Sequence, residues 1–229
     1  MSYQSDCQYP DTDALVYLTG VTTPRTREAH RDGLGLLVQP LSGAHRDIEH
    51  YRYYAADNGC FAEAQGRPWS EARWLRWLEA EVAARPEGCL FAVAPDVVGN
   101  ADATTERSAP YLELIRDLGL PAAYVAQDGL TPATTPWGTF DALFIGGSTE
   151  WKLGPDAQAL TTEAINRGLW VHMGRVNSWR RLALAQAWGV NSADGTYLAY
   201  GPERNWPAVV SWLDRLAALG RPTPMPRAA

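Results

Sequence analysis

Apolar residues along the chain gather in eight short runs, and polar segments with helical spacing follow most of them. Several runs are apolar throughout, which is typical of strands buried on both faces of a parallel sheet. A glycine, a proline or a polar residue closes each run, as expected where a strand ends. We predict strands at residues 13–19, 33–39, 53–57, 89–94, 122–126, 142–145, 169–173 and 189–191.

Five segments between or after these runs carry apolar residues at helical spacing. In the first, Ser70 is placed to cap a helix on which Trp74, Trp77 and Leu78 recur along one face. Glycines lie just past the ends of several others, as stop signals. We predict helices at residues 70–82, 101–118, 156–167, 177–188 and 206–219, with weaker helical character at 24–32 and 131–140.

Eight buried strands that alternate with helices close most naturally into a (β/α)8 TIM barrel of the α/β class, because parallel strands need crossover connections. We predict one barrel domain at residues 1–220 and a disordered, proline-rich tail at 221–229. The alternative is a doubly wound open sheet. Its dinucleotide fingerprint, G-x-G-x-x-G, is missing here, since Gly33 and Gly35 lack the third glycine.

Composition narrows the class of protein. With 229 residues, 46% of them hydrophobic, the chain can bury one α/β domain. It contains no apolar run of roughly 18 residues and no signal sequence, so we expect a cytoplasmic protein that does not contact a membrane. Three widely separated cysteines predict neither a disulfide framework nor a metal site. A net charge of −6 excludes a surface that is basic all over, so any contact with phosphate must be local.

Polar groups end most of the predicted strands. In a (β/α)8 barrel the carboxyl ends of all strands share one rim, so groups far apart in the sequence converge there. Carboxylates that share one low-dielectric pocket repel each other, which raises the pKa of some of them and leaves others ionised. Such a set suits the cleavage of glycosidic bonds. We expect a pocket lined by Asp57, Asp96, Gln127, Asp128, Gly146, Gly147, His172 and Asp194.

Most of these residues also have a purely structural interpretation. Asp57 and Asp128 stand in turn sequences, and Asp96 is placed to cap the helix after it. His172 can be a hydrogen-bonded core histidine. The two glycines suit a tight strand exit, although their backbone N–H groups can also bind a carbonyl oxygen. Asp194 lies between small residues at the end of the last predicted strand and is the strongest single candidate.

The most basic stretch follows the seventh predicted strand. Arg175, Arg180 and Arg181 surround Ser178, where a helix is expected to begin. Helix amino termini after the seventh strand of a barrel commonly bind phosphate, and Lys152 would extend the patch. The alternative is an ordinary solvated helix face.

Six short motifs follow one another between residues 54 and 202. They are Ala56-Asp-Asn-Gly-Cys-Phe61, Val93-Ala-Pro-Asp-Val-Val-Gly99, Val125-Ala-Gln-Asp-Gly129, Phe144-Ile-Gly-Gly-Ser148, His172-Met-Gly-Arg175 and Gly189-Val-Asn-Ser-Ala-Asp194. In this order they resemble the tRNA-guanine transglycosylase superfamily. The resemblance is closer to its short branch, the deoxypurine-in-DNA A (DpdA) proteins of phages and bacterial genomic islands, which exchange guanine in DNA for a 7-deazaguanine.

The resemblance implies a pentosyltransferase in which Asp194 attacks the anomeric carbon and Asp57 acts as acid and base. The partners would be DNA, with its guanine flipped out or single-stranded, and a free 7-deazaguanine base of the preQ0 type. Accessory DNA-modification proteins are further candidate partners, and no cofactor or metal is implied. By the same analogy the base is bound by Asn58, Asp96, Gln127, Asp128, Gly146, Gly147, His172 and Met173.

Two departures from the family pattern affect the substrate. The tRNA enzymes carry a carboxy-terminal zinc site of three cysteines and a histidine, and this sequence has no such cysteines. We therefore expect no zinc subdomain, and DNA rather than tRNA. Asp128 stands where those enzymes have glycine, and Asn58 replaces their serine. The alternatives are a hydrolase or transferase acting on a nucleoside or other small N-glycoside, and a non-catalytic barrel that binds a nucleotide.

Overall fold

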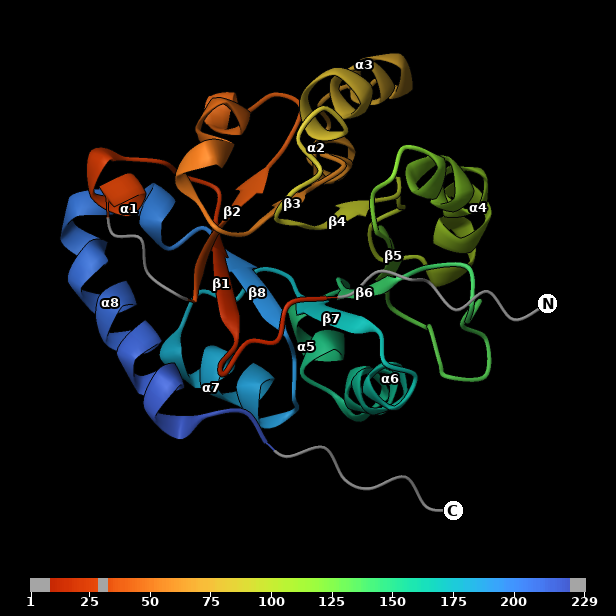
Figure 1. Cartoon of the computed structure of the whole chain (residues 1–229). Coiled ribbons are helices and arrows are strands. Elements are labelled where there is room, and N and C mark those ends of the chain that lie inside the picture. The colour runs from red at the N-terminus through yellow and green to blue at the C-terminus, as the bar shows by residue number, and fades with distance from the viewer. Residues whose placement is uncertain (1–8, 29–32, 223–229) are drawn as a thin grey trace.

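Eight parallel strands close into one barrel in the computed structural model, which describes residues 9–28 and 33–222 (Figure 1). Each strand pairs with its neighbours in the sequence, and β1 closes the barrel by pairing with β8. The strands are β1 (Val16–Thr19), β2 (Leu34–Val38), β3 (Tyr54–Ala56), β4 (Cys89–Val93), β5 (Ala122–Ala126), β6 (Ala142–Ile145), β7 (Trp170–Met173) and β8 (Ser192–Gly195). The predicted (β/α)8 fold is confirmed.

Helices surround the barrel on its outside (Figure 1). They are α1 (Pro24–Glu28), α2 (Phe61–Ala64), α3 (Glu71–Trp77), α4 (Ala101–Asp117), α5 (Thr149–Lys152), α6 (Pro155–Asn166), α7 (Trp179–Ala187) and α8 (Pro202–Leu219). Two 3-10 helices, η1 (Gly43–His50) and η3 (Leu198–Tyr200), and a π-helical turn, η2 (Leu78–Val82), complete the set. As predicted, the Ser70 hydroxyl caps α3, where it accepts from the backbone N–H of Arg73.

Several elements differ from the sequence prediction. Helix α8 begins at Pro202 and not at the predicted residue 206, and α2, α5 and η1 lie in segments where we predicted no helix. The weak helix expected at 131–140 is absent. The Thr135 N–H and hydroxyl both donate to the Thr131 carbonyl in a single turn, but Pro132 and Pro136 supply no N–H group with which to extend it. Strand β8 begins at Ser192, after the predicted 189–191, since Gly189 ends α7 with a φ of 84°. Asp194 therefore lies within a strand and not in a turn. The predicted helical residues 29–32 and tail residues 223–229 lie outside the described residues.

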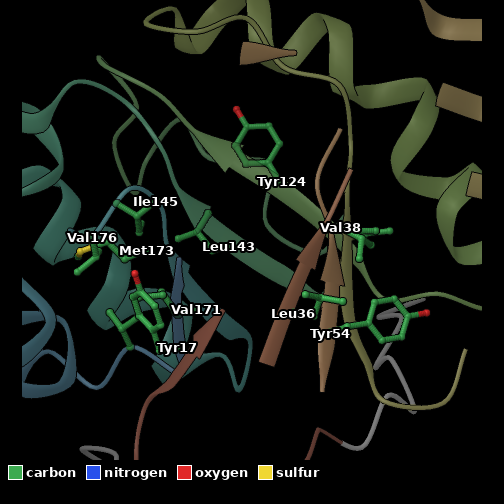
Figure 2. Packing of buried hydrophobic residues seen from close by; sticks show 14 of the residues in the cluster. Tyr17, Leu36, Val38, Tyr54, Tyr124, Leu143, Ile145, Val171, Met173 and Val176 are labelled. Atoms are coloured by element: carbon green, nitrogen blue, oxygen red, sulfur yellow. The ribbon is translucent and has the colours of Figure 1, made fainter. Parts of the chain in front are cut away.

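Alternate residues of the strands enter two separate core layers. One side of each strand, such as Tyr17, Val171 and Met173, packs with helix residues in the layer between barrel and helices (Figure 2). The other side, such as Val16 and Trp170, packs with residues of other strands and with Tyr9 of the amino-terminal segment, which places it inside the barrel. This alternation decides which polar side chains can reach the mouth of the barrel.

No helix in the described ranges is long and apolar enough to span a membrane.

Candidate active site

A pocket of about 530 Å³ opens at the carboxyl ends of the strands, a size typical of sites for small molecules. This is the rim at which we predicted the candidate site residues. Of the predicted residues, it is lined by Asp57, Asn58, Asp96, Gln127, Gly146, Gly147, Arg175 and Asp194.

Asp194 is held in one orientation at the inner wall of this pocket. Its Oδ1 accepts two hydrogen bonds, from His172 Nε2 at 3.0 Å and from the backbone N–H of Arg175 at 3.2 Å. Within residues 9–28 and 33–222, no hydrogen-bond donor reaches its other oxygen, Oδ2. The side chain is only 12% exposed. One carboxylate oxygen is thus anchored, and the other is available to a ligand.

His172 does not line the pocket, although the sequence prediction placed it in the pocket lining. Its side chain is fully buried inside the barrel, where its ring lies 4.5 Å from that of Phe144. Its Nδ1 lies 2.8 Å from the Ser192 hydroxyl, which also accepts from Trp170 Nε1 at 2.8 Å. Because a carboxylate can only accept hydrogen bonds, Nε2 carries a hydrogen and donates a hydrogen bond to Asp194 Oδ1. In the neutral ring the Ser192 hydroxyl must then donate to Nδ1, so a directed chain of hydrogen bonds supports Asp194 from behind.

Asp57 follows β3 and has the properties of an acid/base at neutral pH. Burial raises the pKa of its carboxyl to about 7, the Gly59 N–H opposes this shift, and the negative charges of Asp194 and Asp96 add to it. The Oδ1 atom of Asp57 accepts from that N–H at 2.7 Å. Near pH 7 the group exists in both protonation states, which is the condition for transferring a proton in either direction.

Asn58, Asp96 and Gln127 form one connected network beside Asp57. Asp96 Oδ1 accepts from Asn58 Nδ2 at 2.9 Å, and its Oδ2 accepts from Gln127 Nε2 at 2.6 Å. Backbone partners determine the orientation of both amides, because Asn58 Oδ1 accepts the N–H of Cys60 and Gln127 Oε1 accepts that of Gly99. Burial raises the pKa of Asp96, and the two amide donors oppose that shift. The network presents preorganised lone pairs and an N–H to the pocket.

The two glycines after β6 line the pocket, but their N–H groups are not available to a carbonyl oxygen of a base. Gly146 N–H donates to the Ala126 carbonyl and Gly147 N–H donates to Gln127 Oε1, both at 3.0 Å. The prediction of two backbone donors is therefore wrong in this structure. Glycine is required here for close packing, since a Cβ on Gly146 would lie 2.8 Å from Val125 Cγ1.

Two further predicted residues do not line the pocket. Asp128 lies in the turn after β5, where its two oxygens accept from the hydroxyl and the N–H of Ser148 at 2.6 and 2.7 Å. Burial alone would raise the pKa of Asp128, but these bonds outweigh it and lower the pKa. Met173 points to the layer between barrel and helices, with Ile145 and Val176 (Figure 2). Neither residue touches the pocket.

The predicted phosphate patch is only partly supported. Lys152 is 1% exposed and donates to the Gly174 carbonyl, so its ammonium cannot contact a phosphate on the surface. Ser178 caps α7 by accepting from the Arg181 N–H. Arg180 is exposed and Arg181 is half-buried, and a phosphate role for these two arginines stays a prediction. Arg175 does line the pocket, where its guanidinium donates to the Gly147 carbonyl and lies over the Phe61 ring.

Sequence reasoning missed the rim of the pocket. Three large, exposed hydrophobic residues line this rim: Leu41, Phe61 and Tyr200, which are 66%, 42% and 75% exposed. Arg67 and Arg73 line it as well. Exposed aromatic rings beside guanidinium groups can stack bases and contact phosphates. Little in the sequence marks these residues, because they come from loops and short helices without a period.

Comparison with known proteins identifies the fold alone. No family model matches the sequence, and no curated protein matches it. Solved structures of tryptophan synthase from M. tuberculosis resemble this barrel. The aminoacrylate- and BRD0059-bound form aligns with a TM-score of 0.50 and 12% identity over 93% of this chain and 94% of that chain. A ligand-free mutant form aligns with a TM-score of 0.54 and 13% identity over 90% and 93%.

Proposed function

We propose that this chain is a transglycosylase that exchanges guanine in DNA for a 7-deazaguanine base through a covalent aspartyl-glycosyl intermediate. One observation carries the proposal: two carboxylates of opposite character share one pocket. Asp194 has one oxygen anchored by two N–H donors and the other open, while the pKa of Asp57 is raised to about 7. Such a pair supplies a nucleophile and an acid/base. The six ordered motifs support the choice of substrate.

The proposed reaction has two matched halves. Oδ2 of Asp194 bonds to the anomeric carbon while the bond from that carbon to guanine breaks, and its electron pair leaves with the base. Protonated Asp57 gives its proton to the departing base. The incoming deazapurine then loses a proton to the Asp57 carboxylate, its ring nitrogen bonds to the same carbon, and the ester to Asp194 breaks. In this proposal Asp96 and Gln127 bind the polar edge of either base.

A second candidate keeps this chemistry but takes a free nucleoside as the substrate. The net charge of −6 and the burial of Lys152 favour it, because both reduce the attraction to a DNA backbone. The pocket of about 530 Å³ is large enough for a nucleoside.

A transfer assay tests the proposal. The protein is incubated at low salt with labelled 7-cyano-7-deazaguanine and either guanine-containing DNA or deoxyguanosine, with and without accessory DNA-modification proteins. We expect label in the DNA with the wild type and with Asp13→Asn, which changes an exposed aspartate outside the pocket, and no label with Asp194→Asn. Label only in deoxyguanosine would favour the nucleoside reaction. No label in either substrate under all these conditions would refute both.

A further inference from the structure

Lys152 is the only lysine in the chain, and the proposed reaction does not use it. It lies at the end of the short helix α5 and is 1% exposed. In the described part of the chain, no carboxylate lies within 4.0 Å of its ammonium group. Burial lowers the pKa of this lysine to about 8, and the positive charges of Arg175 and Arg181 act in the same direction, while Asp194 opposes them. A buried cation without an ion-pair partner is costly, so its one hydrogen bond needs a functional explanation.

That hydrogen bond ends on the peptide group that also holds the nucleophile. Lys152 Nζ donates to the Gly174 carbonyl at 2.7 Å. The N–H of the same peptide belongs to Arg175 and donates to Asp194 Oδ1 at 3.2 Å. A planar trans peptide points its C=O and N–H in opposite directions. Lys152 therefore fixes one end of a rigid unit whose other end anchors Asp194.

The conformation of this peptide is one that the chain would not adopt without a restraint. Arg175 has a φ of 59° and is the only residue other than glycine with a positive φ among residues 9–28 and 33–222. For a residue with a side chain this region is sterically unfavourable. Rotating the peptide by half a turn would bring φ to about −120°, an ordinary value. It would also turn the carbonyl oxygen, in place of the N–H group, toward Asp194.

Gly174 allows this close approach. A Cβ at this position would lie 2.6 Å from Phe144 Cε1 and 3.3 Å from Asp194 Oδ1. Without a side chain, nothing on Gly174 itself resists rotation of the peptide. Besides its own N–H bond to Asp194, the hydrogen bond from Lys152 and the contact of the Arg175 guanidinium with the Gly147 carbonyl hold it in place.

We propose that Lys152 is a positioning residue for Asp194, which it serves by holding the Gly174–Arg175 peptide with its N–H on Oδ1. The effect on catalysis rests on the proposed function, whereas the effect on the peptide does not. When the lysine donor is removed, the peptide rotates, Oδ1 loses one of its two donors, and the nucleophile becomes mobile and faces a carbonyl dipole of the wrong sign.

Nuclear magnetic resonance can observe this peptide directly. Protein labelled with carbonyl-¹³C glycine and ¹⁵N arginine gives signals only for amides of Gly-Arg pairs, and the chain has three, at Arg67, Arg175 and Arg221. In Lys152→Met we expect the Arg175 amide proton to move upfield and to exchange faster with solvent, while Arg67 and Arg221 stay in place. Asp194→Asn should shift the same proton, because it replaces the charged acceptor.

Kinetics and stability then separate positioning from a merely structural role. Methionine fills the same volume without a charge, so Lys152→Met should unfold at the same or a higher urea concentration. We expect kcat for base exchange to fall 10-fold or more with KM unchanged. Thr161→Val is the matched control: it removes a buried donor to a backbone carbonyl within α6 and should leave kcat and the Arg175 signal as they are. Lys152→Gln, which keeps an N–H donor, is the second variant. Its kcat and its Arg175 signal should both stay closer to those of the wild type than in Lys152→Met.

An unchanged Arg175 signal in folded Lys152→Met would overturn the proposal, as would a loss of kcat equal to the loss of folded protein. If Lys152→Met does not fold, Lys152→Leu, which also lacks the N–H donor, takes its place and the same two outcomes decide. If the wild type transfers no base, the proposed function fails, yet the Arg175 signal still tests the positioning role.

Discussion

Replacing Asp57 by asparagine should make the protein more stable and inactive at once. The carboxyl has a pKa of about 7 in the folded protein against an ordinary value of 3.8. A tenfold change in proton affinity is worth about 1.4 kcal/mol, so the charged form destabilises the fold by up to roughly 4 kcal/mol. The side chain borders the pocket, where water screens part of this effect, and we expect Asp57→Asn to gain about 2–4 kcal/mol at pH 8.

The gain should depend on pH in a definite direction. Below pH 4 both states of the wild type hold the proton, so the variant gains little. Between about pH 4 and 7 the folded state binds the proton while the unfolded state has lost it, so the stability of the wild type falls as the pH rises. Above pH 7 the difference between variant and wild type is complete.

Urea unfolding at pH 4.5, 6 and 8 measures this difference, with Asp13→Asn as the control for loss of an exposed carboxylate. Base exchange should be lost in Asp57→Asn at every pH, because an amide cannot transfer the proton. An Asp57→Asn variant that is no more stable than the wild type at pH 8, or whose advantage does not grow with pH, would show that Asp57 does not hold its proton in the folded state.

Two further predictions concern buried polar contacts. His172→Leu removes the Nε2–H donor to Asp194, so kcat should fall about 10- to 100-fold with KM unchanged, as steady-state kinetics would show; an unchanged kcat would contradict its supporting role. Asp141→Asn weakens a buried carboxylate that accepts from both Arg116 and the Ala122 N–H, so the free energy of unfolding should fall by about 3 kcal/mol. Glu163→Gln, which breaks an exposed ion pair, is its control and should change the free energy by less than about 1 kcal/mol.

The fold could be predicted from the sequence because it depends on a repeated pattern. Runs 122–126 and 142–145 match β5 and β6 residue for residue, since apolar residues fill both faces of these strands. The predicted last strand begins three residues early, because residues 192–195 are small or polar and form no apolar run. Ser192 and Asp194 are polar because they form hydrogen bonds with His172 of β7. Contacts with another strand leave no pattern in the local sequence.

The members of the site were predicted less well than its location. Strand ends indicate the rim, but the side on which a strand residue lies follows from alternation, which separates His172 from Met173. Asp128 lies in the turn after β5, and its hydrogen bonds to Ser148 could not be predicted from the sequence. The burial of Lys152 could not be foreseen, because its partner is a backbone carbonyl on another strand end. Base recognition, the phosphate role of the arginines and the choice of DNA stay predictions.

The connection between β5 and β6 has a consequence for local opening. Residues 127–141 form turns without a helix, so the wall of the barrel there is covered by Phe140, stacked on Tyr124, and by Trp137 against it. Two rings bury less backbone than a helix does. The backbone N–H groups of this segment also form few hydrogen bonds to neighbouring strands. Amide exchange in the native state should therefore begin at this segment, well before the amides of β7 and β8 behind Asp194 become accessible.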